Sequence, residues 1–213
     1  WSGTVQVKDI NDDSSGAASS NPQGFVAINN VLYFAATGGA YGTELWKSDG
    51  SDTGTVRVKD IESGSGSSWP SNLIDVDGTL FFTAQSSANG TELWKSDGTS
   101  SGTVQVKDIQ SGTESSNPLS FRVNSGTLYF VATNDQYGVE LWKSDGSETG
   151  TVIVRDANTG THHSDPSNFI SVGSMVYFSA NDNVNGHELW RTDGTNAGTI
   201  LVKDIWSGPN GSS

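Results

Sequence analysis

Short hydrophobic runs alternate with polar, glycine-rich stretches along the whole chain, and this alternation recurs every 48 residues. The tripeptide Glu-Leu-Trp marks the period and ends at Trp46, Trp94, Trp142 and Trp190. Four linker prolines keep the same spacing: Pro22, Pro70, Pro118 and Pro166. A fixed period of this length is typical of repeat architectures. The prolines divide the chain into an N-terminal stretch, 1–21, and four repeats, 22–69, 70–117, 118–165 and 166–213.

Each repeat predicts four short strands, which in the third repeat are residues 120–123, 128–133, 140–143 and 152–156. The second of these is a continuous apolar run, which is typical of a strand covered on both faces. The connections are short, so consecutive strands are expected to pair as an antiparallel meander. In the Ser-Asp-Gly turn before the last strand, the Asp145 carboxylate can accept a backbone hydrogen bond and Gly146 can adopt a positive φ.

A single four-stranded sheet of this size cannot bury both of its faces, whereas sheets that pack face to face around an axis can. A β-solenoid is the less suitable alternative, because its coils are shorter and carry one strand per face. We therefore expect one all-β domain, a β-propeller of four four-stranded antiparallel blades or a four-blade segment of a larger propeller.

The N-terminal stretch 1–21 contains a surplus outer strand and a linker. Residues 3–10 are a fifth copy of the segment that supplies the last strand of each repeat. This copy is expected to compete with residues 199–205 for the last edge of a closed ring, or to belong to a blade outside the chain. A third hypothesis is that it completes the edge of a second molecule, because unpaired strand edges promote association.

The segments 44–50, 92–99, 140–147 and 188–195, with the Gly-Thr and Val-Lys-Asp-Ile pieces that follow, resemble the bacterial ELWxxDGT repeat proteins. The resemblance covers all four repeats, with mild departures such as Arg191-Thr192 in place of Lys-Ser. It implies a large exported protein, extracellular or at the cell surface, often of unassigned function. It implies no catalytic residue.

Composition narrows the possible partners. The chain has 24 acidic and 11 basic residues and a net charge of −13, which repels nucleic-acid phosphates and anionic lipids. No apolar run approaches the roughly 18 residues that a membrane helix needs, so we expect neither nucleic-acid binding nor membrane insertion. The absence of cysteine excludes disulfides and thiolate metal sites. The start at Trp1 rather than Met suggests that a leader or preceding domains have been removed.

Residues that recur in every repeat are expected to be structural. The four Glu-Leu-Trp tryptophans are predicted to pack between adjacent blades. Glu44 and its equivalents are predicted to form cross-strand ion pairs with Lys59 and its equivalents. Asp60 and its equivalents are predicted to cap backbone N–H groups of the linkers.

Residues that differ between repeats are better candidates for binding. One position before the Glu-Leu-Trp motif holds Tyr41, Asn89, Tyr137 and Asn185, each followed by glycine. Rings stack on sugars and amides bind hydroxyls, so these residues suit carbohydrate recognition; a solvated loop is the alternative. Trp69 replaces the Asn or Asp that precedes the other prolines, which suggests a contact surface or packing over a blade edge.

Metal-binding signals are weak. Asp12, Asp13, Asp135 and Asp182 supply oxygen ligands in Gly- or Asn-rich loops, which suits calcium, but none matches an EF-hand. His162 and His163 are adjacent, and neighbouring side chains of an extended segment point in opposite directions, which argues against a shared metal. No other cofactor is indicated.

No nucleophile elbow, P-loop, dinucleotide fingerprint or HExxH motif is present. We therefore predict a non-enzymatic binding or scaffold module of an exported bacterial repeat protein, with adhesion or carbohydrate recognition as its task and a glycan or protein surface as its partner. The alternative is a structural repeat that self-assembles by strand exchange through residues 3–10 into surface or filamentous material. A hydrolase with a site built from distant loops is a third hypothesis.

Overall fold

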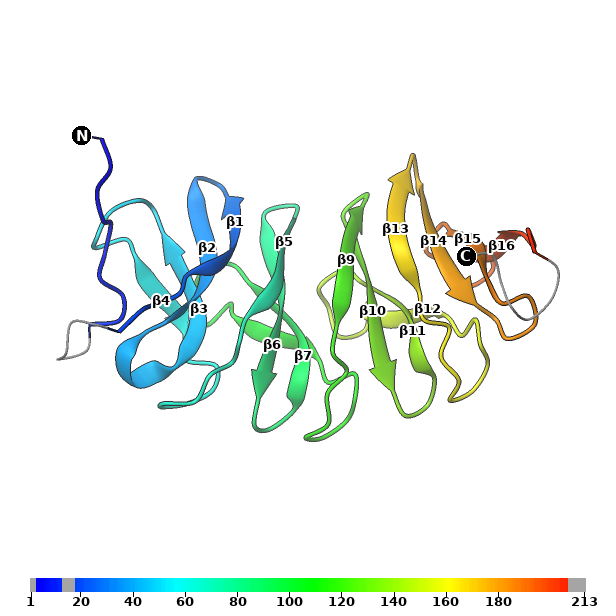
Figure 1. The fold of residues 1–213 in the computed structure, drawn as a ribbon, viewed down its shortest axis with the longest axis horizontal. Coiled ribbons are helices and arrows are strands. Elements are labelled where there is room, and N and C mark those ends of the chain that lie inside the picture. Colours follow the sequence, from blue (N-terminus) through cyan, green and yellow to red (C-terminus); the bar gives the residue numbers. More distant parts are fainter. Residues whose placement is uncertain (1–2, 13–17, 207–213) are drawn as a thin grey trace. The chain divides into compact units, whose positions relative to one another are not determined.

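The computed structural model describes residues 3–12 and 18–206 of the 213. These residues form sixteen β-strands and one short 3-10 helix, Gly39–Tyr41. The strands build four antiparallel sheets of four strands each (Figure 1). The fold class is therefore all-β with four blades of the β-propeller type, as predicted.

Each blade is a meander in chain order and lies within one 48-residue repeat. Blade 1 has β1 (Gln23–Ile28), β2 (Val31–Thr37), β3 (Thr43–Ser48) and β4 (Val56–Lys59). Blade 2 has β5 (Ser71–Val76), β6 (Thr79–Ser86), β7 (Gly90–Ser96) and β8 (Val104–Lys107). Blade 3 has β9 (Leu119–Asn124), β10 (Thr127–Asn134), β11 (Gly138–Ser144) and β12 (Val152–Arg155). Blade 4 has β13 (Ser167–Val172), β14 (Met175–Asn181), β15 (His187–Thr192) and β16 (Ile200–Lys203).

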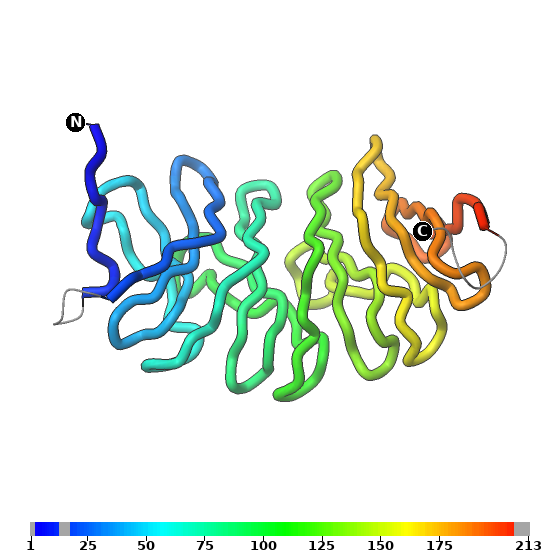
Figure 2. The backbone as a smooth tube through the Cα atoms, in the orientation of Figure 1, coloured from blue at the N-terminus to red at the C-terminus, as the bar shows by residue number. Residues whose placement is uncertain are grey.

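The chain divides into two compact units, and the division falls within β8. The N-terminal unit, Trp1–Gln105, contains blade 1 and all of blade 2 except the end of β8, and the C-terminal unit, Val106–Ser213, contains blades 3 and 4. Within each unit the backbone completes one meander before it enters the next (Figure 2). That all four blades form one domain stays a prediction.

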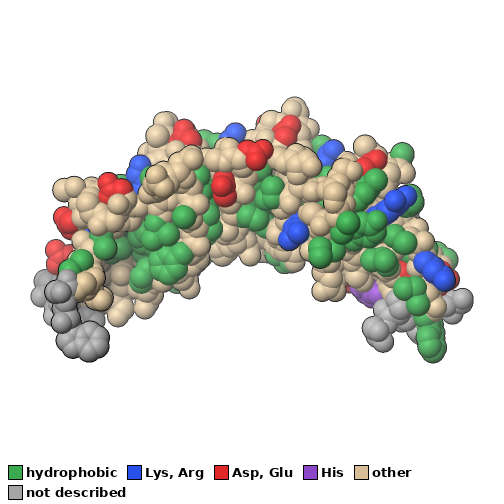
Figure 3. Space-filling view, turned by 90° about the horizontal axis from the view of Figure 1, so that it is seen from above, with side chains coloured by type: hydrophobic (Ala, Val, Ile, Leu, Met, Phe, Trp, Pro, Cys, Tyr) green, Lys and Arg blue, Asp and Glu red, His purple; other side chains and the backbone are tan. Residues whose placement is uncertain are grey.

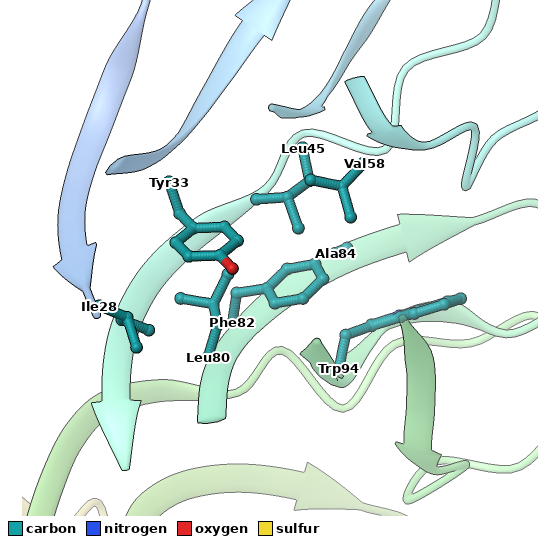
Figure 4. Packing of buried hydrophobic residues seen from close by; sticks show 8 residues of the cluster. All are labelled: Ile28, Tyr33, Leu45, Val58, Leu80, Phe82, Ala84 and Trp94. Atoms are coloured by element: carbon teal, nitrogen blue, oxygen red, sulfur yellow. The ribbon is translucent and has the colours of Figure 1, made fainter. Parts of the chain in front are cut away.

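Two blades share one hydrophobic cluster in the N-terminal unit. Its buried members are Ile28, Tyr33, Leu45 and Val58 of blade 1 and Leu80, Phe82, Ala84 and Trp94 of blade 2. Figure 4 shows side chains of the two sheets directed toward one another. Side chains of a strand alternate between its two faces, so blade 1 has one face toward blade 2 and a second face that carries Phe34, Ala36 and Trp46. Full burial of a side chain such as Phe82 stabilises the fold by about 1.5–3 kcal/mol.

The C-terminal unit repeats this packing at equivalent positions. Tyr129, Leu141 and Val154 of blade 3 meet a cluster from blade 4, which consists of Val176, Phe178, Ala180 and Trp190. The same two faces therefore meet in both units: a Tyr/Leu face of the earlier blade, and a Phe/Ala/Trp face of the later blade. We use these two names for the equivalent faces of every blade.

The Ser-Asp-Gly turn fits closely against the neighbouring blade. Gly98 has φ 86°, and a Cβ at this position would overlap the hydroxyl group of Tyr33 in blade 1. Lys47 Nζ donates a hydrogen bond of 2.9 Å to the Gly98 carbonyl oxygen. In blade 3, the predicted turn is confirmed, because Ser147 N donates to Asp145 Oδ1 at 2.8 Å and Gly146 has φ 88°.

Residues 3–12 form no strand, although residues 3–10 have the sequence of an outer strand. They lie against the Phe/Ala/Trp face of blade 1, where Ile10 packs against the cluster of Phe34, Ala36 and Trp46. The Lys8 ammonium group lies 3.7 Å from the Asp52 carboxylate and donates a hydrogen bond to the Asp52 carbonyl oxygen at 3.0 Å. The fifth copy therefore covers part of a blade face.

The surface carries charged side chains of both signs, and hydrophobic side chains gather in patches between them (Figure 3). No helix of the described residues is long and apolar enough to cross a membrane.

Candidate functional site

In blades 1 and 3, the recurring glutamate fastens the blade to the linker that follows it. Glu44 lies on β3 and is fully buried. Its carboxylate accepts hydrogen bonds from Ser68 Oγ at 2.6 Å, Ser68 N at 3.1 Å and Ile61 N at 3.1 Å. Burial raises the pKa of Glu44, while these donated hydrogen bonds act in the opposite direction.

Glu140 of blade 3 makes the equivalent contacts. Ser164 Oγ donates to it at 2.6 Å, Ser164 N at 3.1 Å and Ala157 N at 3.2 Å. Burial raises the pKa of Glu140 to about 7. A buried acid of this kind suits general acid catalysis only where it reaches a cleft, and this carboxylate is fully shielded from solvent and held by the linker.

The predicted ion pairs with this glutamate are wrong in blades 1 and 3. Lys59 Nζ donates to the Thr103 carbonyl oxygen of blade 2 at 2.7 Å, and Arg155 Nη1 donates to the Thr199 carbonyl oxygen of blade 4 at 2.6 Å. The basic residues therefore reach the next blade rather than the glutamate on the adjacent strand.

The predicted capping role of the recurring aspartate is confirmed in three linkers. Asp60 Oδ2 accepts from Gly64 N at 3.3 Å, and Asp156 Oδ2 accepts from Gly160 N at 3.0 Å. Asp108 holds Gly112 N in the same way, at 3.2 Å. The aspartate of each of these linkers therefore stabilises the turn that follows its outer strand.

The aspartate of the Ser-Asp-Gly turn also makes hydrogen bonds within its own turn. Asp49 Oδ1 accepts hydrogen bonds from Ser51 Oγ at 2.7 Å and Ser51 N at 2.9 Å, which lower the pKa of Asp49. The carboxylate is exposed and acts within its own turn.

The predicted packing role of the recurring tryptophan is confirmed where two blades share a unit. Trp94 belongs to the cluster between blades 1 and 2, and Trp190 belongs to the cluster between blades 3 and 4. Their buried Nε1 atoms have no hydrogen-bond partner among the described residues. These rings are therefore packing groups and are not available to a sugar.

The variable position lies on the loop between the second and third strands of each blade. Tyr41 ends the 3-10 helix and is 46% exposed, and the Arg57 guanidinium carbon lies 3.6 Å from its ring centroid. Tyr137 is half-buried, and its backbone N donates to Asn134 Oδ1 at 2.9 Å. These two residues lie in different units and are placed on separate loops.

The two asparagines at this position are half-buried and held within their own loops. Asn89 N donates to Ser86 Oγ at 3.2 Å. Asn185 donates from its backbone N to Asp182 Oδ1 and from Nδ2 to Asp182 Oδ2, each at 2.7 Å. The Asn185 amide is therefore a structural group of its loop, and the contacts of the described residues do not bring the four variable residues together.

Trp69 is 58% exposed and has φ 49°, the left-handed region. Asn21, Asn117 and Asp165 share this conformation at the equivalent positions before the other prolines. The conformation favours Asn and Asp over a bulky residue, so the tryptophan adds strain as well as apolar surface. An exposed ring at a strained position is consistent with a contact role.

The calcium candidates do not converge among the described residues. No group of three or more His, Asp or Glu side chains there is arranged to hold a metal ion. Asp12 and Asp135 are exposed, and Asp182 binds its own loop; Asp13 lies outside the described residues.

The two adjacent histidines are used separately, as expected for an extended segment. His163 Nδ1 accepts a hydrogen bond from Val139 N at 2.9 Å, and His162 Nδ1 lies 3.1 Å from the Thr159 carbonyl oxygen. They therefore hold the backbone around one linker and share no ligand.

A polar pocket of about 190 Å³ opens beside the variable loop of blade 3. Its lining comes from the preceding linker and from the loop between β10 and β11: Ile109, Gln110, Ser111, Asn134, Asp135 and Gln136. Asp135 N donates to Gln110 Oε1 at 2.9 Å and thereby joins the two segments. Of these residues only Asp135 was singled out from the sequence. The others could have been found only by a prediction of the contact between linker and loop.

No family model matches the sequence, and no curated protein matches it. Solved structures match the fold. A puromycin hydrolase has a TM-score of 0.55 at 15% identity, over 87% of this chain and 30% of that chain. A Mycobacterium tuberculosis puromycin-hydrolyzing peptidase has 0.50 at 11% identity, over 91% of this chain and 30% of that chain.

A third solved structure, Bacteroides ovatus Xyloglucan PUL GH43B, has a TM-score of 0.38 at 15% identity, over 89% of this chain and 42% of that chain. This score is too low to carry an argument. The chain spans less than half the length of each of the three proteins. The similarity to the two hydrolases shows the fold alone.

Proposed function

We propose that the chain is a non-enzymatic scaffold module of an exported repeat protein, and that its variable loops bind carbohydrate. The observation that carries this proposal is that side chains that recur in every repeat hold the fold together, whereas side chains that vary between repeats lie on loops. Recurring polar groups such as Glu44, Lys59 and Asp60 join one blade to the next or hold its linker. The loops between the second and third strands differ from repeat to repeat, and in blade 3 the exposed loop residues Asp135 and Gln136 line a polar pocket beside Tyr137.

The lining of this pocket suits hydroxyl groups. The Asp135 carboxylate accepts hydrogen bonds, and the Gln136 amide both donates and accepts them; both residues are exposed. The volume of about 190 Å³ is below the roughly 300 Å³ at which pockets for drug-sized ligands begin. The pocket therefore suits one sugar ring of a longer glycan rather than a large apolar ligand.

Aromatic stacking is the second contribution, and it is available in the N-terminal unit. The exposed ring of Tyr41 has the Arg57 guanidinium over one face. A cation–π contact of this kind contributes about 0.5–1 kcal/mol at an exposed site and fixes the ring. The uncovered face can then stack on a sugar ring at little cost in side-chain entropy.

A glycan array followed by titration of the strongest ligand tests the proposal. Asp135→Ser with Gln136→Ala gives blade 3 the residues that blade 2 carries at these positions, Ser87 and Ala88, so the fold tolerates them. We expect this variant to lose glycan affinity by about tenfold or more, the effect of removing roughly 1.4 kcal/mol of binding energy.

Glu148→Ala is the matched control, because it removes one negative charge from an exposed turn of the same blade. Its glycan affinity is expected to equal that of the wild type. Absence of binding to every glycan, or equal affinity of the double variant and the wild type, contradicts the carbohydrate proposal.

A further inference from the structure

In the N-terminal unit, the Tyr/Leu face of blade 1 consists of seven apolar positions, and blade 2 covers it. The seven residues are Val26, Ile28, Val31, Tyr33, Leu45, Val58 and Ile61. Leu45 is 0% exposed and Val58 is 6% exposed, because blade 2 places its Phe/Ala/Trp face against them (Figure 4).

Blade 4 has an apolar residue at each of the same seven positions. They are Ile170, Val172, Met175, Tyr177, Leu189, Val202 and Ile205. Leu189 is 40% exposed and Val202 is 44% exposed, in contrast to Leu45 and Val58. Ile170, Val172 and Ile205 are more exposed still. A contiguous apolar face of this kind is the signature of an interaction surface.

The chemistry of the partner follows from the interfaces already described. In both units, the Tyr/Leu face is covered by the Phe/Ala/Trp face of another blade. Blade 1 has such a face in Phe34, Ala36 and Trp46. Beside this face lies a groove of about 200 Å³, and its apolar lining includes the exposed side chain of Phe25. The equivalent residue of blade 2, Leu73, packs against blade 1 instead.

Residues 3–12 lie on blade 1 as an outer strand and linker of a preceding blade would. Three contacts of the linker between blades 1 and 2 have counterparts here. Lys59 reaches the blade 2 backbone and Lys8 the blade 1 backbone, in each case the turn between the third and fourth strands. Glu62 accepts from Ser87 N as Asn11 accepts from Gly39 N, and Ser68 O accepts from Gln85 N as Ser20 O accepts from Thr37 N.

Residues 3–10 also have the sequence of an outer strand, because they are identical to residues 102–109, which contain β8. Val7 is 41% exposed, whereas Val106, its counterpart in β8, is 6% exposed. The segment therefore makes the contacts that an outer strand makes with the following blade. Among the described residues, however, no strand pairs with it in the way that the third strand of a blade pairs with the fourth.

We propose that blade 4 of one molecule packs its Tyr/Leu face against blade 1 of a second copy, and that residues 5–8 of this copy replace β16 beside β15. The replacement is needed because β16 and residues 5–8 would otherwise occupy the same position between the two blades. β15 pairs Leu189 with Lys203 and Arg191 with Ile200. The register places Lys8 opposite Leu189 and Val5 opposite Arg191.

Strand addition of this kind supplies backbone hydrogen bonds, and the buried faces supply apolar burial. The interface is heterologous, since it joins the last blade of one copy to the first blade of another. Repetition of such a contact produces a ring or an open filament.

Disulfide cross-linking of the full chain tests the register, because the chain has no cysteine of its own. Val5→Cys with Arg191→Cys places the two thiols on opposed residues of the proposed strand pair, within the roughly 5–6 Å between Cα atoms that a disulfide needs. Val5→Cys with Val184→Cys is the control, because Val184 lies on the exposed loop before β15, at the end of this strand opposite to Arg191. We expect a ladder of disulfide-linked oligomers from the first pair and only monomer from the control.

Analytical ultracentrifugation over a wide range of protein concentration tests, without any cysteine substitution, whether the apolar face of blade 4 mediates self-association. We expect the wild type to form species larger than the monomer and Ile170→Glu with Val172→Glu, both on β13 within the proposed interface, to lose them. Val184→Glu, which adds charge at an exposed position outside the face, is expected to keep them.

Three results would overturn the proposal. They are a wild-type monomer at all concentrations, cross-linking of the first cysteine pair within one molecule, and equal oligomer formation by the two cysteine pairs. The cross-linking experiment remains decisive if the charged variant fails to fold, and none of these readouts depends on glycan binding.

Discussion

The hydroxyl of Ser164 donates a hydrogen bond of 2.6 Å to the carboxylate of Glu140, and both residues are fully buried. Glu140 belongs to β11, and Ser164 belongs to the linker that leads to blade 4. Glu44 and Ser68 repeat this contact in the N-terminal unit. A single carboxylate thus satisfies several backbone and side-chain donors of a linker that forms no strand pairs of its own.

Loss of this carboxylate should be far more costly than loss of the hydroxyl. Glu140→Ala removes the carboxylate that accepts from Ser164 Oγ and Ala157 N, and it leaves Ser164 N only its 3.0 Å hydrogen bond to the Val139 carbonyl oxygen. We therefore expect a loss of about 3 kcal/mol in the free energy of unfolding. Ser164→Ala removes one donor and is expected to cost about 1 kcal/mol. Chemical denaturation followed by circular dichroism measures both values, and the exposed Glu148→Ala should change stability by no more than about 0.5 kcal/mol. Equal costs for Glu140→Ala and Ser164→Ala would contradict this role.

The same carboxylate predicts a dependence of stability on pH. Burial raises the pKa of Glu140 from an ordinary value of 4.5 to about 7. Between these values, the folded chain holds a proton that the unfolded chain has released. The contribution to stability is therefore full below the ordinary pKa and is lost as the pH rises through about 7. We expect the melting temperature to fall with rising pH across this window, and Glu140→Gln to have a shallower slope. Identical slopes for this variant and the wild type would show that Glu140 does not titrate there.

The strands and their turns could be predicted because they depend on local patterns. The predicted strand 128–133 lies within β10, Thr127–Asn134, since a continuous apolar run bounded by polar loops has few alternatives. The Asp145-Gly146 turn follows from the side-chain chemistry of Asp and the positive φ available to Gly.

The partners of Glu44 could not be predicted in this way, because they depend on register. β3 pairs with β4 through a β-bulge between Leu45 and Trp46, and Leu45 lies opposite Lys59, the last residue of β4. Glu44 therefore lies beyond the end of β4, beside the linker, rather than opposite a basic side chain. A bulge shifts the register and is not visible in the spacing of residues.

The polar pocket of blade 3 could not be predicted from the sequence for a related reason. Gln110 and Gln136 are far apart in the sequence but line the same pocket, where Asp135 N donates to Gln110 Oε1. Neither glutamine stands out by composition, so only the path of the linker reveals the pair.

Substitution of two glycines distinguishes the cost of a steric clash from the cost of backbone strain. Gly138 has φ 66°, and a Cβ there would lie 2.6 Å from the His162 carbonyl oxygen. Gly160 has φ 82°, with no atom within 4 Å of an added Cβ. We expect Gly160→Ala to cost about 1 kcal/mol from backbone strain alone, and Gly138→Ala to cost about 3 kcal/mol or more. Thermal unfolding measures both, and similar costs would mean that the linker at His162 yields without penalty.

His163 should be replaceable by serine but not by leucine. Its Nδ1 atom accepts a hydrogen bond from Val139 N, and in blade 1 Ser67 Oγ accepts from Thr43 N at the equivalent position. His163→Ser keeps an acceptor and is expected to change stability by less than about 1 kcal/mol. His163→Leu leaves Val139 N without this acceptor and is expected to cost about 1–3 kcal/mol. Urea denaturation distinguishes the two, and equal stability of both variants would show that water replaces the imidazole.

Because the indole nitrogen of Trp190 has no hydrogen-bond partner among the described residues, we expect Trp190 to tolerate replacement by phenylalanine. This side chain packs in the cluster between blades 3 and 4, and its buried Nε1 has no hydrogen-bond partner among the described residues. Trp190→Phe keeps an aromatic ring in the cluster and removes that buried donor, so the loss of packing is partly offset and the cost should be about 1 kcal/mol. Trp190→Ala opens a cavity and should cost about 3–5 kcal/mol. Thermal unfolding followed by circular dichroism measures both changes, with the exposed Trp206→Phe as a control that should leave the midpoint unchanged. Similar losses for Trp190→Phe and Trp190→Ala would mean that the indole N–H is satisfied, by water for example, and that the nitrogen contributes to the stability of the blade contact.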